Sequence, residues 1–148
     1  PCVSVSTLES MAYNFLSTDC IVCAVMDARC SQVYNALFEI KSGVVTRLCD
    51  DRALSLDDLK NELLSVDGRI IIAGDGTDIT CKYIGNEIKN AESAPVNLKY
   101  QRASSTALVA FEMINNGQTV SAQELMPVYL RLPQAQRELN KKLGGRTK

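Results

Sequence analysis

Residues 21–48 read IVCAVMDARCSQVYNALFEIKSGVVTRL, and this stretch decides the fold that we predict. It begins with an apolar run, typical of a strand buried on both faces, and continues with alternating apolar and polar side chains, as in a half-buried strand. Short polar connectors separate these segments and fit hairpins better than crossovers. The first strand ends in a charged pair, Asp27 and Arg29. We therefore predict an antiparallel three-strand meander, with helices packed on it, over residues 21–28, 33–40 and 44–48.

The composition is that of a globular domain. The chain has 148 residues, 46% of them hydrophobic, and no apolar run approaches the roughly 20 residues that a transmembrane helix needs. Sixteen basic and 17 acidic residues leave a net charge of −1, whereas a protein that binds nucleic acid through its own surface is usually basic. The chain opens Pro1-Cys2-Val3 without an initiator Met, so we expect a fragment or a processed product.

Six cysteines are too few for a disulfide scaffold in a chain of this length. Cys20 and Cys23 form a CxxC motif, but it runs into the first predicted strand, where an offset of three places two side chains on opposite faces. We therefore expect small buried thiols in a reducing cytosol. A redox or structural module that uses Cys20 and Cys23 is kept as a further hypothesis.

Helix signals occur on both sides of the meander. Ser6 and Glu9 have the spacing of a capping box, and the apolar residues that follow predict a helix to Leu16. Ser55 and Asp58 begin a second helix in the same way. The other predicted elements are a polar link at 49–54, strands at 70–73 and 95–99, helices at 79–88 and 103–115, an irregular return at 119–130, a last helix from Pro133 and a basic tail at 144–148.

Gly74, Asp75 and Gly76 lie between a predicted buried strand and a predicted helix, where an α/β protein can hold a phosphate. No third glycine stands in dinucleotide-fingerprint spacing and no Lys-Ser/Thr pair follows, so we favour plain turn chemistry. Asp27 and Arg29 could equally bind a partner or form a hairpin ion pair. These five residues are the candidate site. Four further acids, Asp50, Asp51, Asp57 and Asp58, have no metal-ligand spacing and suit helix starts, so we predict no metal site.

The chain contains no histidine. This excludes Ser-His-Asp and Cys-His triads, HExxH zinc sites and histidine general bases. The cysteines fall mostly on predicted strands beside apolar neighbours, where a thiol is inert. We therefore predict no catalytic residue and no bound cofactor in this chain, and expect it to hydrolyse neither peptide nor ATP above background.

Five stretches, in register along nearly the whole chain, carry a resemblance to a known family. They are Val5-Ser-Thr-Leu-Glu-Ser-Met-Ala12, Met26-Asp-Ala-Arg-Cys-Ser-Gln-Val-Tyr-Asn-Ala-Leu-Phe-Glu39, Ile71-Ile-Ala-Gly-Asp-Gly76, Tyr100-Gln-Arg-Ala-Ser-Ser105, and Pro127-Val-Tyr-Leu-Arg131 followed by Gln136-Arg-Glu-Leu139. Together they resemble the carboxyl-terminal two thirds of the TsaB (YeaZ) family. Its members are accessory subunits of the bacterial machinery that places threonylcarbamoyl on adenosine 37 of tRNAs.

The resemblance implies an α/β fold, namely a ribonuclease-H-like lobe of the actin-like (sugar kinase/heat-shock ATPase) superfamily. Its sheet would combine the antiparallel meander with parallel strands and flanking helices. Residues 1–17 would end the first lobe and form the connecting helix, residues 18–131 would form the second lobe, and residues 132–148 a C-terminal helix and tail. Cys30 departs from the family, in which a longer side chain often stands there.

The implied function is that of a cytoplasmic, non-catalytic scaffold. It would support a TsaD-like catalytic subunit beside a TsaE-like ATPase, contact tRNA only indirectly and allow a homodimer. ATP and a metal ion would belong to the partner subunits, and the metal-binding histidines of TsaD are missing here. The alternative is a nucleotide-binding actin-like domain, with weak or no ATPase activity, that uses Asp27 and the Gly74-Asp75-Gly76 turn.

The expected absence of the first lobe has a consequence for helix 6–16. Its apolar stripe, Leu8, Met11, Phe15 and Leu16, would lose part of its cover. The family's dimer and TsaD contacts would also lie largely on the absent lobe. We therefore expect this chain to self-associate through that helix and the neighbouring sheet edge, or to be poorly soluble.

Overall fold

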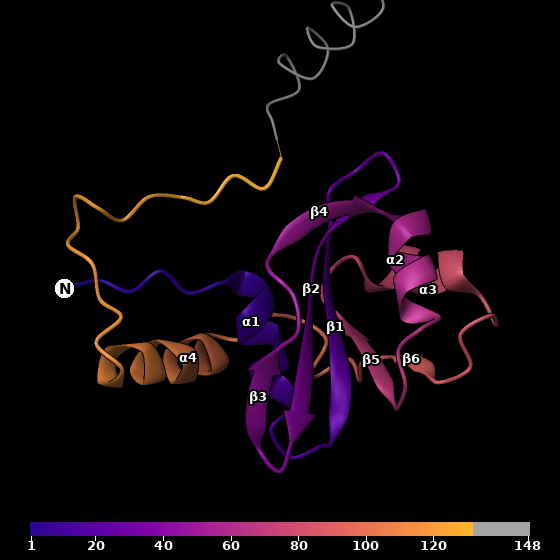
Figure 1. Cartoon of the computed structure of the whole chain (residues 1–148), viewed down its shortest axis with the longest axis horizontal. Helices are drawn as coiled ribbons and strands as arrows, with labels where there is room; N and C mark the ends of the chain where they lie inside the picture. Colours follow the sequence, from indigo (N-terminus) through magenta and orange to yellow (C-terminus); the bar gives the residue numbers. More distant parts are fainter. Residues whose placement is uncertain (132–148) are drawn as a thin grey trace, which may run out of the picture.

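The computed structural model describes residues 1–131, and its centre is a mixed six-stranded sheet (Figure 1). In chain order the elements are α1 (Thr7–Ala12), the 3-10 helix η1 (Tyr13–Phe15), β1 (Cys20–Asp27), β2 (Gln32–Lys41), β3 (Val44–Arg47), β4 (Arg52–Ser55), α2 (Leu56–Leu63), β5 (Ile70–Ala73), α3 (Thr77–Ile84), β6 (Ala91–Ser93) and α4 (Ala103–Asn115). The strand order is β3-β2-β1-β5-β6, with β4 also paired to β2. Helices α1 and α4 lie on one side of the sheet and α2 and α3 on the other, which makes three layers.

The predicted meander is confirmed, and β1 lies at the centre of the sheet because both its faces are apolar. It pairs antiparallel with β2 along its whole length and parallel with β5 over residues 21–24. Val22 and Ala24 pack in the core beneath α1, whereas Cys23 and Val25 pack in the core beneath α2 and α3. Burial on both faces is what the continuous apolar run required.

Residues 52–55 form a strand, β4, where we predicted a polar link, so that prediction is wrong. β4 pairs antiparallel with the first half of β2. Its local sequence looks polar because it begins with Arg52, whose side chain bonds to residues outside this strand. The Arg52 Nη2 donates to the Oδ1 of fully buried Asn35 at 3.0 Å and to Glu62 at 2.6 Å. The ladder with β2, rather than an apolar pattern of its own, holds this strand in place.

Ser6 caps α1 as predicted, since its Oγ accepts the N–H of Glu9 at 3.2 Å. The reciprocal half of the capping box is replaced, because the Glu9 carboxylate pairs with Arg47 at 2.6 Å. After Ala12 the chain continues as η1, which carries the helical path to Phe15.

The apolar stripe of α1 and η1 is buried within this chain. Leu8, Met11 and Phe15 are 3%, 1% and 2% exposed, and they pack on the face of the sheet formed by β1, β2 and β5. The expectation that this stripe would lie partly uncovered is therefore wrong for these three residues, whereas Leu16, which follows η1, is half-buried. The sheet supplies enough apolar surface to bury these three without a further lobe.

The opposite face of the sheet is covered by α2 and α3. Ser55 caps α2 as predicted, and its Oγ accepts the N–H of Asp58 at 3.0 Å. The leucines Leu56, Leu59 and Leu63 of α2 are buried with Ile70 and Ile72 of β5 and with Ile84 of α3. Helix α3 begins at Thr77, two residues before the predicted start at Ile79, directly after the glycine turn.

The strand after α3 is β6, at Ala91–Ser93, and not residues 95–99 as predicted. β6 pairs parallel with β5, and the N–H of Ala94 still donates to the Ile72 carbonyl at 2.9 Å. Pro95 then ends the ladder because it has no N–H to donate. The next residues form a turn in which Val96 is 83% exposed.

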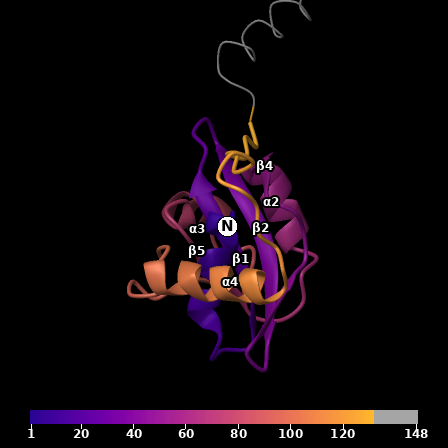
Figure 2. The same ribbon diagram turned by 90° about the vertical axis from the view of Figure 1, so that its left-hand side faces the viewer.

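Helix α4 has the predicted bounds, but only Ser105 and Val109 are buried on it. The Ser105 Oγ donates to Asn14 at 2.6 Å, which fixes the start of α4 against η1. Beyond α4 the chain returns irregularly, as predicted, over residues 118–131, called here the returning segment (Figure 2). It pairs with the amino terminus at one bridge, Cys2 with Val120. The predicted last helix from Pro133 and the tail lie outside the described residues.

Candidate functional site

The five predicted site residues come together at one edge of the sheet, and we call Asp27, Arg29, Gly74, Asp75 and Gly76 the rim cluster. β1 and β5 are parallel, so their carboxyl ends meet at the same edge. The Asp27 N–H donates to the Asp75 Oδ1 at 3.1 Å, and the Arg29 N–H donates to the Asp27 Oδ1 at 2.7 Å. Two segments 48 residues apart are thereby joined.

The hairpin between β1 and β2 has an unusual backbone. Arg29, Cys30 and Ser31 have φ values of 64°, 55° and 55°, three consecutive side-chain-bearing residues in the left-handed region. The Arg29 guanidinium lies 3.6 Å from the Asp27 carboxylate with its side chain 85% exposed. An ion pair this exposed contributes little to stability. The pair therefore acts as a hairpin contact that leaves the guanidinium open to solvent.

The glycines of the rim cluster allow two backbone segments to approach closely. A Cβ on Gly74, whose φ is +117°, would lie 1.9 Å from the Val25 carbonyl oxygen. A Cβ on Gly76 would lie 3.1–3.3 Å from backbone atoms of Met26 and Asp27. Both positions therefore need glycine for packing against β1, whether or not a ligand binds.

The polar groups of the glycine turn are already engaged within the chain. The N–H groups of Gly74, Gly76 and Thr77 donate to the carbonyls of Lys99, Val25 and Gly74 at 2.6, 3.2 and 3.2 Å. The acidic side chain of Asp75 flanks these amides and would repel a phosphate, whereas Asp78 is already paired with Lys99 at 2.6 Å. The geometry therefore favours the turn interpretation over the phosphate-binding alternative.

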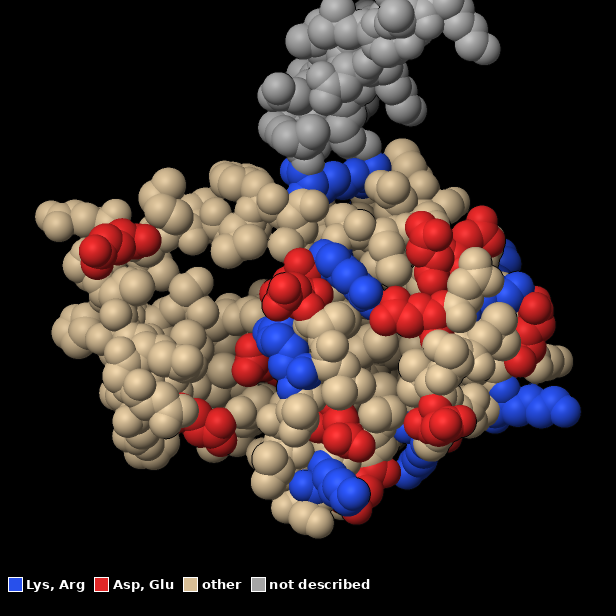
Figure 3. Space-filling view, in the orientation of Figure 1, with Lys and Arg blue, Asp and Glu red and all other residues tan. Residues whose placement is uncertain are grey.

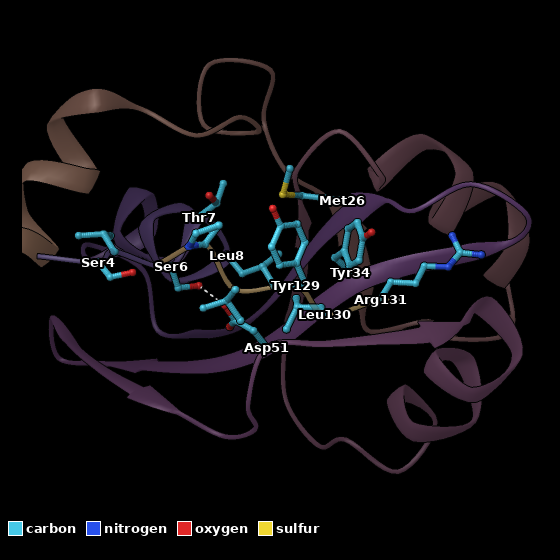
Figure 4. Close-up of a pocket in the computed structure, with 13 residues that line it drawn as sticks. Ser4, Ser6, Thr7, Leu8, Met26, Tyr34, Asp51, Tyr129, Leu130 and Arg131 are labelled. Carbon is cyan, nitrogen blue, oxygen red and sulfur yellow. Dashed lines mark hydrogen bonds between the residues drawn. The ribbon is translucent and has the colours of Figure 1, made fainter. Parts of the chain in front are cut away.

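A second feature lies between the amino-terminal segment and the returning segment. A cavity of about 510 Å³ is lined by residues 4–8 and 127–131, with Met26, Tyr34 and Asp51 (Figure 4). Tyr34 from β2 and Tyr129 from the returning segment both line it. Arg131 reaches past them to donate to the Ala28 carbonyl, next to the rim cluster. The cavity has the size of a small-molecule site.

The acidic group in this cavity, Asp51, is already paired. Its Oδ2 accepts the Ser6 hydroxyl at 2.5 Å, and its Oδ1 pairs with Arg47 at 2.6 Å. Burial opposes the charge on Arg47, but the hydrogen bonds to Asp51 and Glu9 outweigh it and raise the Arg47 pKa. A carboxylate held by a permanent cation is a poor general base. This network therefore ties α1 to β3 and does not supply acid-base chemistry.

The cavity residues Tyr34 and Tyr129 were not among the site residues predicted from the sequence. The available signal was that both belong to stretches that carry the family resemblance, residues 26–39 and 127–131. Nothing local indicated that these stretches meet, because they are almost a hundred residues apart and the returning segment has no periodic pattern.

The CxxC cysteines point to opposite faces of β1, as predicted. Cys20 packs in the core beneath α1 and Cys23 in the core beneath α2, and both are unpaired thiols. Burial raises the pKa of Cys23, so its thiol stays protonated and unreactive. This arrangement opposes the hypothesis of a redox module that uses Cys20 and Cys23 as a pair.

Three of the four acids that could suggest a metal site have other partners, and those of Asp51 are given above. Asp57 accepts the Tyr83 hydroxyl and Asp58 accepts the Ser55 hydroxyl at 2.6 Å. Among residues 1–131, no three side chains of the cysteine, aspartate and glutamate types come together as metal ligands. Within the same residues, no helix is long and apolar enough to span a membrane.

Comparison with known proteins places this fold in a class. Two solved structures from Pseudomonas aeruginosa share this fold. YeaZ matches 85% of this chain with a TM-score of 0.64 and 19% sequence identity. An uncharacterized protein with similarity to peptidase YEAZ matches 86% of this chain with a TM-score of 0.63 and 20% identity. The protein is therefore an α/β domain with the fold seen in YeaZ structures. No family model matches the sequence.

A curated relative narrows the class. The tRNA threonylcarbamoyladenosine biosynthesis protein TsaB of Bacillus subtilis (strain 168) is 26% identical over 137 residues, or 92% of this chain. The chain is thus TsaB/YeaZ-like over most of its length. It spans 58% of the length of that relative and 57% of each solved structure.

Proposed function

We propose that this chain acts as a non-catalytic accessory subunit in the formation of threonylcarbamoyladenosine at position 37 of tRNAs. It would bind and support a TsaD-like catalytic subunit in the cytoplasm, beside a TsaE-like ATPase, and contact tRNA only through these partners. The observation that carries the proposal is the match to TsaB over 92% of the chain. The site agrees with it, since the carboxylates Asp27 and Asp51 are both engaged in hydrogen bonds within the chain.

The proposal includes the domain assignment. Residues 18–131 would be the second ribonuclease-H-like lobe of an actin-like fold, and residues 1–17 the end of a first lobe with its connecting helix. The mixed sheet supports this assignment: an antiparallel meander, β1 to β3, is followed by parallel strands, β5 and β6, on the far edge.

The proposal is tested by measuring the modified nucleoside in tRNA and by testing whether the chain co-purifies with a TsaD-like protein. The chain is expressed in cells depleted of their own TsaB, and threonylcarbamoyladenosine is measured by mass spectrometry of digested tRNA. The chain is also co-expressed with a tagged TsaD-like protein from the same source. We expect co-purification and a rise in the modified nucleoside. Failure of both, with the chain folded, would contradict the proposal.

The rim cluster offers matched variants for the same assay. Arg29→Ala removes an exposed guanidinium and Lys41→Ala removes an exposed ammonium elsewhere, so neither is expected to disturb the core. If the rim cluster contacts the partner, Arg29→Ala weakens co-purification and Lys41→Ala does not. ATP hydrolysis by the chain alone that is abolished by Asp27→Asn would favour the nucleotide-binding alternative instead.

A further inference from the structure

The cavity between the amino-terminal segment and the returning segment is held open by contacts within the chain. Backbone hydrogen bonds of 2.8 and 2.9 Å join Cys2 to Val120, and the Arg131 guanidinium donates to the Ala28 carbonyl. These contacts attach the returning segment to the rest of the chain before and after residues 127–130, which line the cavity. The volume of about 510 Å³ therefore lies behind a wall that is fixed at two points.

The lining of the cavity is largely apolar and continues into the core. Leu8 is 3% exposed and belongs to the core beneath α1, and Met26 packs against the same core. On the returning segment, Val128 and Tyr129 line the cavity although they are 75% and 83% exposed. Figure 3 shows mostly tan, uncharged side chains along this segment, at the upper left. A ligand in the cavity would remove this apolar surface from water, which favours binding.

Within residues 1–131, two charged side chains line the cavity, and neither is free to pair with a charge inside it. Asp51 is paired with Arg47 at 2.6 Å. The Arg131 guanidinium is directed away from the other labelled side chains, toward the Ala28 carbonyl (Figure 4). The other polar side chains of the lining are uncharged hydroxyls, on Ser4, Ser6, Thr7, Tyr34 and Tyr129. A charged ligand would therefore lose hydration without gaining an ionic partner, which disfavours it relative to a neutral one.

We propose that this cavity binds a neutral small molecule with a flat aromatic ring system. Two rings, those of Tyr34 and Tyr129, line it from separate parts of the chain, and aromatic side chains interact favourably with a further ring by stacking or edge contact. The Met26 thioether also favours an aromatic neighbour. The hydroxyls can bond one polar edge of the ligand, whereas a phosphate requires a cation or amides directed at it.

The volume sets the size of the ligand. An apolar cavity of about 150 Å³ holds one benzene molecule. The cavity of about 510 Å³ therefore holds a ligand of two or three rings. This inference does not depend on the proposed role in tRNA modification.

Binding of the dye N-phenyl-1-naphthylamine to the whole 148-residue chain tests the proposal. The dye is neutral, has three aromatic rings and becomes more fluorescent when it leaves water. We expect saturable binding of one dye per chain. The matched comparison is 8-anilinonaphthalene-1-sulfonate, which has the same rings and one negative charge, and it should bind about tenfold or more weakly. Equal or tighter binding of the sulfonate, or displacement of the neutral dye by ATP, would overturn the proposal.

Variants and nuclear magnetic resonance locate the bound dye. Tyr129→Ala removes an aromatic wall at an exposed position, so the fold is retained, and it should weaken binding by about tenfold or more. Phe111→Ala is the matched control, because it removes an exposed ring on α4, and it should leave binding unchanged. The dye should shift the amide signals of residues 4–8 and 127–131. Shifts confined to residues 103–115, weaker binding in Phe111→Ala alone, or no saturable binding by the unaltered chain would each contradict the proposal.

Discussion

Replacing Gly74 by alanine tests whether the glycine turn is required for packing. The φ of Gly74 is +117°, a conformation that costs a residue with a side chain about 1–3 kcal/mol. The added Cβ would also lie 1.9 Å from the Val25 carbonyl oxygen, so the turn must move away from β1. That movement weakens the 3.2 Å bond from the Gly76 N–H to the same carbonyl, worth about 0.5–1.5 kcal/mol.

We therefore expect Gly74→Ala to lower the free energy of unfolding by about 2–4 kcal/mol. This is a large share of the roughly 5–15 kcal/mol that stabilises a typical domain. Urea unfolding followed by circular dichroism measures it. The control is Gly68→Ala, which also has a positive φ, +90°, but meets nothing within 4 Å of the new Cβ.

The comparison of the two variants separates backbone strain from collision with β1. Gly68→Ala carries the strain alone and should be the milder change by about 0.5–1.5 kcal/mol. Equal losses for the two variants would refute the packing argument. A loss of partner or nucleotide binding by Gly74→Ala without a loss of stability would instead favour a ligand role for the turn.

Three further predictions concern the core and its titratable groups. Leu59→Ala, at a fully buried position of α2, should cost about 2–5 kcal/mol in urea unfolding, and a loss below about 1 kcal/mol would contradict the assigned core. Burial, and then the hydrogen bond to Glu112, raise the pKa of Tyr13 above its ordinary 10.0. Because the unfolded chain loses this proton at a lower pH than the folded chain, the free energy of unfolding should fall as the pH rises past about 10. The fall should be less steep in Tyr13→Phe, which has no hydroxyl to titrate. Cys30 is exposed and should react with a thiol reagent in the folded protein, whereas Cys23 should react only after denaturation. If Cys23 were labelled rapidly in the folded Cys30→Ser variant, that result would be inconsistent with the burial of Cys23.

Local patterns in the sequence determined most of the helices and strands. The meander was predictable because burial on one or two faces leaves a periodic trace in consecutive residues. The caps at Ser6 and Ser55 were predictable because a hydroxyl bonds an amide three residues away. The absence of histidine likewise restricted the available chemistry before any geometry was known.

Only the tertiary structure decided the features that depend on distant partners. β4 is a strand because β2 offers it a ladder, and its own four residues show no apolar alternation. The apolar stripe of α1 is buried, whereas the equally apolar side of α4 is exposed to solvent. The two helices have similar sequence patterns, but the stripe of α1 packs on the sheet and this side of α4 does not. Asp27 meets Asp75, and Tyr34 meets the returning segment, because the parallel register of β1 with β5 and the path of the chain after α4 bring them together. Such contacts join residues far apart in the chain, and no window of consecutive residues records them.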